Sequence, residues 1–240
     1  MPTDVTQLPS RLQGPVQEYL ALLQALAGER LRAVSLFGAA GEAARAGKPA
    51  LIQNVVVLDD VRLDFVRELG AQGPALGRLG IQAPLLMSPE YIAASLDVFP
   101  IELLDIQHRH LNVLGEDYFA PLKFDRTHVR LQLERELKRA IIHLRQDILT
   151  AGGRDKRLAE IYWAAAEHTL LLLRAVLWLH DKTVPAAAAG IVESAAKVCG
   201  VDLSGLQPAL AGARSIDFFA LRSLYDSVLA LTDYVDGLSV

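Results

Sequence analysis

Two carboxylates stand at a spacing that could support chemistry. Glu102 and Asp105 lie three residues apart in the apolar segment VFPIELLDI, residues 98–106, which we predict to be a strand. Because residues three apart on a strand point to opposite faces, the two do not make a general acid and base. Each remains a candidate metal ligand or an ordinary carboxylate near the end of a strand.

Histidines and an arginine supply two further candidates. His108 and His110 are two residues apart, which places both imidazoles on one face of a strand and could begin a zinc site. The lack of another Cys or His nearby in the sequence favours solvated or capping histidines. Arg174 and His180 lie six residues apart in an apolar helical segment, about 600° of rotation, so they occupy different faces of that helix. The pattern favours a buried ion pair for Arg174, with Glu167 as a partner.

A loop of small residues between two apolar runs is the other candidate site. The segment 31–58 reads LRAVSLFGAAGEAARAGKPALIQNVVVL. Backbone amides of Gly38, Ala39, Ala40 and Gly41, with Lys48 nearby, could cradle a phosphate. The alternative, which the pattern favours, is a tight turn from a strand into a short helix, with solvated basic residues.

The elements around these residues change character along the chain. The first half alternates helical and strand patterns, with strands expected at 31–37, 50–58, 84–87 and 98–106 and a further strand candidate at 108–114. Ser88 is expected to cap a helix that has Pro89 at its first position. After Pro121 the pattern is helical, with Asp125 as a cap and helices expected at 125–151, 158–180, 186–199 and 217–238. The fold class is therefore α+β: a mixed sheet with helices in residues 1–122 and an all-α up-and-down helical bundle in residues 123–240.

The segments SLFGAAGEAARAGKPALIQNVVVL and VFPIELLDIQHRHLNVLGED resemble the core of the polymerase-beta-like nucleotidyltransferases. In that superfamily a Gly-Ser loop joins two strands, the second strand carries Asp-x-Asp, and a later strand carries a third carboxylate. The resemblance covers most of the chain, because some bacterial members also carry a C-terminal helical bundle. It implies a nucleoside triphosphate and two Mg²⁺ ions held by the carboxylates.

The residues that would perform this chemistry are degenerate. Gly38 matches the family glycine, Ala39 replaces the serine, Ile52 and Asn54 stand where the two aspartates would lie, and Glu102 is the best match for the third carboxylate. Mg²⁺ requires hard oxygen ligands, which Ile52 lacks and Asn54 offers only as a neutral amide. Shifting the pair Asp59-Asp60 into the metal positions fails, because adjacent strand residues point to opposite faces. We therefore expect no catalytic residue and no cofactor, or Mg²⁺ if the chain is active.

Composition limits the function further. The net charge of -4 excludes a general nucleic-acid binder, and 52% hydrophobic residues give a 240-residue chain ample core. The single Cys199 and the absence of a leader-like start favour a cytoplasmic protein. The most apolar segment, residues 161–179, contains charged residues that a membrane span rarely accepts.

Three functions follow as alternatives. The first is a catalytically inactive nucleotidyltransferase-like protein that binds a nucleotide or a protein partner, with self-association through an apolar face of the bundle as one form. The second is an active, metal-dependent nucleotidyltransferase that uses Glu102, Asp105 and Asp59 or Asp60. The third is a ribonuclease or toxin-system component, because Arg174 and His180 resemble the Arg...His motif of the HEPN domains. Ala175 stands where that family usually has a polar residue.

Overall fold

The computed structural model describes residues 4–38, 51–213 and 215–239, and the chain divides into two compact units. The first unit comprises Met1–Leu96 and Ile106–Lys123, and the second comprises Asp97–Asp105 and Phe124–Val240. The predicted boundary at 122/123 differs by one residue from the change of unit after Lys123, but the second unit also takes the short segment Asp97–Asp105. Among the described residues, no helix is both long and apolar enough to span a membrane.

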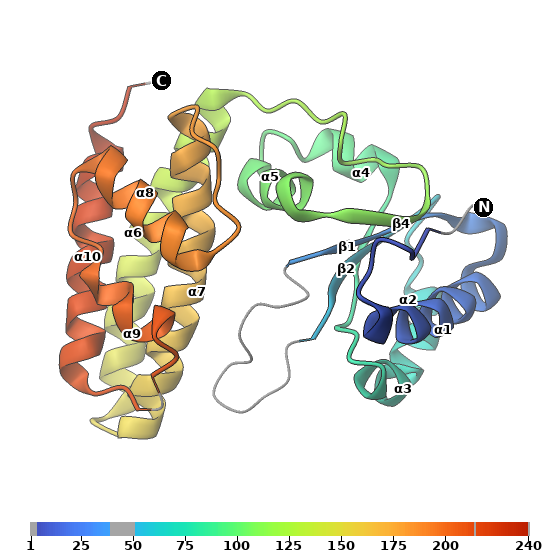
Figure 1. Ribbon diagram of the computed structural model, residues 1–240, viewed down its shortest axis with the longest axis horizontal. Helices are drawn as coiled ribbons and strands as arrows, with labels where there is room; N and C mark the ends of the chain where they lie inside the picture. Colours follow the sequence, from blue (N-terminus) through green and yellow to red (C-terminus); the bar gives the residue numbers. More distant parts are fainter. Residues whose placement is uncertain (1–3, 39–50, 214, 240) are drawn as a thin grey trace. The chain divides into compact units, whose positions relative to one another are not determined.

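The first unit is built on a mixed sheet, as predicted, with four strands among its described residues (Figure 1). Its strands run in the order β3-β2-β1-β4, in which β1 pairs antiparallel with β2 and β4, and β2 pairs parallel with β3. The strands are β1 (Leu31–Phe37), β2 (Gln53–Leu58), β3 (Leu85–Met87) and β4 (Leu111–Gly115). The continuous apolar run of β2 is buried along almost its whole length, as expected of a strand covered on both faces.

Helices cover one face of this sheet through a single apolar cluster. Val34 and Val56 of the strands pack in it with Tyr19 of α1, Phe65 of α2 and Leu76 of α3. The helices of the unit are α1 (Ser10–Ala27), the short η1 (Gly28–Arg30), α2 (Leu63–Ala71), α3 (Gly73–Arg78) and α4 (Pro89–Ala94). The predicted cap of α4 is confirmed, because the Ser88 side chain accepts a hydrogen bond from the backbone N–H of Tyr91.

The prediction of a strand at residues 98–106 is wrong. This segment forms the helix α5 (Pro100–Arg109), in which Ile101 and Leu104 are buried. Pro100 is the first residue of the helix, where its missing N–H is no loss. The strand that follows, β4, begins only at Leu111.

The second unit is a helical bundle, as predicted (Figure 1). Its helices are α6 (Arg126–Ala151), α7 (Asp155–Leu179), α8 (Ala188–Cys199), η3 (Ser204–Leu206), α9 (Gln207–Leu210) and α10 (Phe218–Asp236). Asp125 caps α6 by accepting from the N–H groups of Thr127 and His128, as expected. Helix α7 is buried on most of its surface, because α6, α8 and α10 all pack against it.

Candidate functional site

The end of β1 requires a glycine at residue 38. Gly38 has a φ of +74°, in the left-handed region that side chains disfavour, and a Cβ at this position would lie 2.7 Å from Oε1 of Gln53. Gln53 begins β2 and lies directly opposite Phe37. The predicted phosphate-binding residues Ala39, Ala40, Gly41 and Lys48 lie outside the described residues, so Gly38 is the part of that prediction that the structure describes.

The two faces of β2 carry different residues beside Gly38. Ile52 and Asn54 point to the face covered by α1, because Ile52 packs on the apolar cluster there and Asn54 contacts Tyr19. Gln53 and Val55 point to the other face, since successive strand residues alternate. Gln53 is therefore the side chain next to Gly38, and none of the described residues 52–55 carries a carboxylate.

Asn54 holds three segments of the first unit together. Its Oδ1 accepts a 2.6 Å hydrogen bond from the hydroxyl of Tyr19, and its Nδ2 donates to the backbone carbonyl of Gln82 at 2.9 Å. Only 1% of Asn54 is exposed. Burial raises the pKa of Tyr19, so this phenol stays protonated and donates. An amide fits here because the site needs one acceptor and one donor, and a carboxylate offers no donor.

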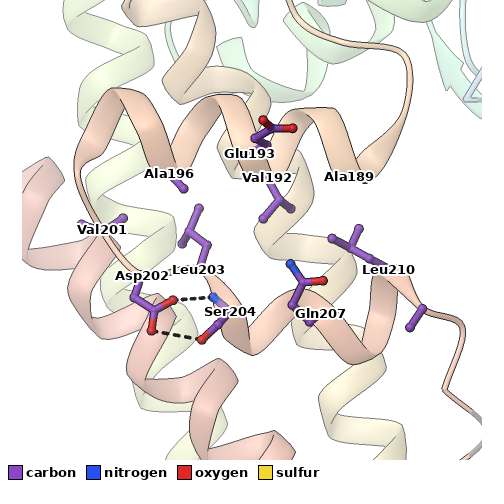
Figure 2. A pocket seen from close by; sticks show the side chains of 11 residues that line it. Ala189, Val192, Glu193, Ala196, Val201, Asp202, Leu203, Ser204, Gln207 and Leu210 are labelled. Atoms are coloured by element: carbon purple, nitrogen blue, oxygen red, sulfur yellow. Dashed lines mark hydrogen bonds between the residues drawn. The ribbon is translucent and has the colours of Figure 1, made fainter.

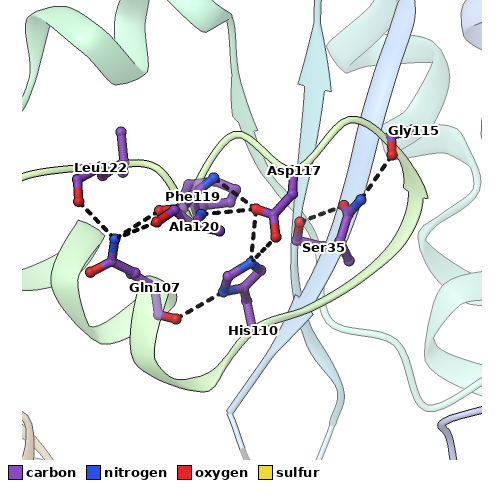
Figure 3. A network of polar contacts seen from close by, with 9 residues as sticks. Ser35, Gln107, His110, Gly115, Asp117, Phe119, Ala120 and Leu122 are labelled. Carbon is purple, nitrogen blue, oxygen red and sulfur yellow. Dashed lines mark hydrogen bonds and ion pairs between the residues drawn. The ribbon is translucent and has the colours of Figure 1, made fainter.

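A second polar pair joins β1 to β4 (Figure 3). The hydroxyl of buried Ser35 donates to Oδ1 of Asn112 at 3.0 Å, and Asn112 Nδ2 donates to the carbonyl of Gly115 at 2.9 Å. The neighbouring strand thus also presents an amide, not a carboxylate, opposite Ser35.

Asp59 and Asp60 follow the other end of β2. Asp59 pairs with Arg32 and Asp60 with Arg62, all with well-exposed side chains. The backbone N–H of Asp59 donates to the carbonyl of Arg30, just before β1 begins. Asp59 follows Gln53 by six residue steps along the strand, a distance of about 20 Å at the usual rise. These carboxylates therefore lie far from Gly38.

Glu102 and Asp105 lie on α5 and contact the helical bundle. Oε2 of Glu102 accepts from Nε2 of Gln132 on α6 at 2.7 Å, and Oε1 of Gln132 accepts from the N–H of Ile101 at 2.8 Å. Asp105 is 7% exposed and lies 3.5 Å from Nη1 of Arg174 on α7. The strand geometry expected for this pair does not apply.

His110 lies in a network that closes the loop after β4 (Figure 3). Its Nε2 lies 2.9 Å from both carboxylate oxygens of Asp117, and its Nδ1 lies 3.0 Å from the carbonyl of Gln107. Gln107 Nε2 in turn donates to the carbonyls of Phe119 and Leu122 at 2.9 Å. A carbonyl and a carboxylate are both acceptors, so each ring nitrogen of His110 faces an acceptor.

Asp117 is the anion of this network. Burial opposes its ionisation, but hydrogen bonds from Ala120 N–H, His110 and Phe119 N–H outweigh it and lower the pKa of the carboxyl. The two histidines predicted to share a strand face are separated, since His108 belongs to α5 and His110 follows its end. The sequence reasoning missed Asp117, whose signal was its place in the turn after a short strand.

Arg174 and His180 do not meet in one site. Arg174 is 8% exposed and pairs with Asp105, a residue that the sequence reasoning did not consider as its partner. His180 follows the end of α7, and its Nε2 lies 2.7 Å from the hydroxyl of Tyr234 on α10. Burial lowers the pKa of His180, helped by Arg126 and Lys182, so the neutral ring accepts from the phenol at neutral pH.

The described part of the second unit contains an open pocket between α8 and the segment 201–211 (Figure 2). Its volume is about 610 Å³, and its apolar lining includes Val192, Ala196 and Leu203. Its polar lining residues include Glu193, Gln207 and Asp202, whose carboxylate accepts from the N–H and hydroxyl of Ser204. Within the described residues, no three His, Cys, Asp or Glu side chains gather in a way that could hold a metal ion.

Comparison with solved structures identifies the class of fold. No protein-family model and no curated protein matches this sequence. Among solved structures, the chain resembles spectinomycin adenyltransferase AAD(9) from Enterococcus faecialis, described with ATP and spectinomycin, with a TM-score of 0.56 and 12% sequence identity. The likeness covers 93% of this chain and 98% of that one. The chain therefore has a nucleotidyltransferase-like fold that continues through the helical bundle.

Proposed function

We propose that this chain is a nucleotidyltransferase-like protein that does not transfer nucleotides and that acts by binding a nucleotide or a protein partner. The observation that carries the proposal is the composition of β2 beside Gly38. The residues there are Ile52, Gln53, Asn54 and Val55, so neither alternation of the strand supplies an oxygen anion. Two Mg²⁺ ions bring four positive charges, which neutral amides do not balance.

The contacts of Asn54 strengthen this proposal. Both ends of its amide are engaged, with Tyr19 on one side and the carbonyl of Gln82 on the other. Only 1% of Asn54 is exposed, so a metal ion at this position would have to open the packing around the amide. The amide therefore serves the packing of α1 on the sheet.

A nucleotide is the small ligand that we favour. The support is the left-handed Gly38 at the end of β1 and the fold shared with an adenyltransferase described with ATP. In this proposal Gly38 and the residues Ala39, Ala40, Gly41 and Lys48 that follow it cradle the phosphates through backbone amides and one ammonium group. Binding of this kind needs no protein-bound metal.

The alternative is an active enzyme with a rearranged metal site. It would need Glu102, Asp105 and Asp59 or Asp60, but the two aspartates after β2 lie at the far end of the strand from Gly38. Asp105 already faces Arg174. The residues present therefore fit a two-metal site poorly, and we derive no reaction step through it.

A transfer assay distinguishes the two. The full chain is incubated with each α-labelled ribonucleoside triphosphate, Mg²⁺ or Mn²⁺, and a mixture of aminoglycoside-type, RNA and protein acceptors. We expect no label on any acceptor and no release of pyrophosphate. Metal-dependent transfer that Glu102→Gln abolishes would overturn the proposal and establish the alternative.

A further inference from the structure

The exposed face of α6 combines apolar and basic residues. Leu131, Ile142 and Leu149 are 50%, 54% and 80% exposed, although large aliphatic side chains usually avoid water. They lie 11 and 7 residues apart, which brings all three to within about 20° of one line along the helix. We call these three residues and the exposed cations that lie between them the α6 stripe. Its members are Leu131, Arg135, Lys138, Ile142, Arg145 and Leu149.

The neighbouring helix α10 carries a face of opposite charge. Its α10 stripe consists of Phe219, Arg222, Asp226, Leu229 and Asp233, again spaced three and four residues apart. Phe219 is 75% exposed, and both aspartates are exposed. Asp236 lies one turn further on and is itself acidic. The α6 stripe holds cations without a carboxylate, whereas the α10 stripe is acidic on balance.

The two stripes lie side by side on one surface of the bundle. Helices α6 and α10 pack against each other and run antiparallel, since Arg145 Nε donates to the hydroxyl of Tyr225 and Arg130 Nη1 to the carbonyl of Val235. Lys138 also reaches across to Asp236. One continuous face therefore offers a basic apolar half beside an acidic apolar half.

We propose that this face binds a second copy of the same chain, as a two-fold dimer in which α6 of each copy lies on α10 of the other. A two-fold axis parallel to the helices and between them brings about this exchange. Rotation about this axis leaves the height of each residue along the helices unchanged. Each α6 therefore contacts α10 of the other copy in the same antiparallel register in which it contacts α10 of its own chain.

The register of the charges supports this arrangement. Arg145 lies at the level of Tyr225, next to Asp226. Lys138 is seven residues before Arg145, and Asp233 is seven residues after Asp226, so the second cation and the second aspartate also meet. Ile142 lies three residues before Arg145 on α6, and Leu229 lies three residues after Asp226 on α10. These two side chains therefore form an apolar contact between the two charge pairs.

The other symmetric arrangement is unfavourable. An axis perpendicular to the helices would lay α6 on α6, which opposes the cations Arg135, Lys138 and Arg145 to those of the second copy. Like charges across an interface cost several kcal/mol in general. Charge complementarity therefore selects the exchange of α6 and α10 over α6 on itself.

Sedimentation equilibrium of the full chain tests the proposal with charge-reversed variants. The α6 variant is Lys138→Glu with Arg145→Glu, and the α10 variant is Asp226→Lys with Asp233→Lys, because all four side chains are exposed. We expect the wild type to dimerise below about 100 µM and each variant alone to dimerise at least about tenfold more weakly. Mixed together, the two variants should form a heterodimer, since each reversed helix then meets its opposite charge.

An apolar substitution gives an independent readout with a matched control. Ile142→Asp should abolish the dimer without lowering the thermal midpoint, because that side chain is half exposed in the single chain. Leu63→Asp, on α2 of the first unit and 85% exposed, should leave the dimer unchanged. A monomeric wild type throughout this range, or a dimer that the α10 variant leaves intact, would overturn the proposal.

Discussion

At the scale of single residues, Asn54 shows why a position that matches a metal ligand in sequence need not be a vestige of one. It is buried, its carbonyl oxygen accepts from Tyr19, and its amino group donates to Gln82. A degenerate catalytic residue would be free to vary. Asn54 instead supplies one acceptor and one donor that the packing of α1 requires.

The first prediction concerns this amide. Asn54→Asp should lower the free energy of unfolding by about 2–4 kcal/mol at pH 7, because a buried carboxylate would face the carbonyl of Gln82 without a proton to donate. The matched control is Gln53→Asp on the opposite face of the same strand, where the side chain is only half-buried. Urea unfolding measures both, and an Asn54→Asp protein as stable as the wild type would contradict this role.

His110 and Asp117 give a second prediction, on pH. The pKa of Asp117 is lowered in the folded state, so its contribution to stability is present above the unfolded value of about 3.9 and is lost as the pH falls through the folded value. Asp117→Asn should therefore be less stable than the wild type at pH 7, by about 1 kcal/mol after allowing for screening of a carboxylate that is 35% exposed.

The difference between Asp117→Asn and the wild type should begin to shrink as the pH falls below about 5, where the carboxyl of the unfolded chain takes up a proton. It should close only below the lowered pKa of the folded state, where both side chains are neutral. Urea unfolding at pH 7, 5 and 3.5 follows this difference. A gap that stays constant across the series would show that the carboxylate charge is not what stabilises the loop.

At the scale of elements, α5 is where tertiary contacts override local pattern. The run VFPIELLDI is rich in β-branched and apolar residues, which favours a strand, yet the segment is a helix. Its buried residues are Pro100, Ile101 and the continuous run from Leu103 to Ile106, so burial here shows neither the alternation of a half-buried strand nor a single helical stripe. The partner that completes its first turn, Gln132, is 31 residues away, so local sequence alone does not reveal it.

A third prediction follows from that partner. Gln132→Leu should cost about 1–3 kcal/mol, because it leaves the buried N–H of Ile101 without an acceptor. Glu102→Gln is the control, since its side-chain oxygen still accepts from Gln132 and its effect should stay within about 0.5 kcal/mol. If Gln132→Leu unfolds at the wild-type urea concentration, the capping account of α5 fails.

The same elements show how much of the fold can be predicted from the sequence. Apolar runs and caps correctly predicted β1, the buried β2, Ser88 and Asp125, because each depends on residues close in the chain. Glu134 and Lys138, four residues apart on α6, also pair at 2.7 Å, which is the spacing that favours such a contact on a helix. The bond of Tyr19 to Asn54 and the pair of Arg174 with Asp105 join residues far apart in sequence, so periodicity held no signal for them.

At the scale of the whole molecule, the chain has a nucleotidyltransferase-like fold, but the strand beside Gly38 lacks carboxylates that could hold metal ions. A fold supports many functions, and function is argued from the site. The net charge of -4 also fits a protein that binds small anions locally and not nucleic acid broadly. Self-association through α6 and α10 would join the second units of two copies.

The most direct test of the central claim is isothermal titration calorimetry with ATP, GTP, CTP and UTP, each in Mg²⁺ and in EDTA. Our account predicts that the affinity for each nucleotide is the same in both conditions within about threefold, because β2 offers the metal no anionic ligand. A chain that binds no nucleotide would act through a protein partner and would show no heat in either condition. Binding that Mg²⁺ tightens by about tenfold or more, a gain of about 1.4 kcal/mol, would show that the chain completes a metal site and would contradict the account.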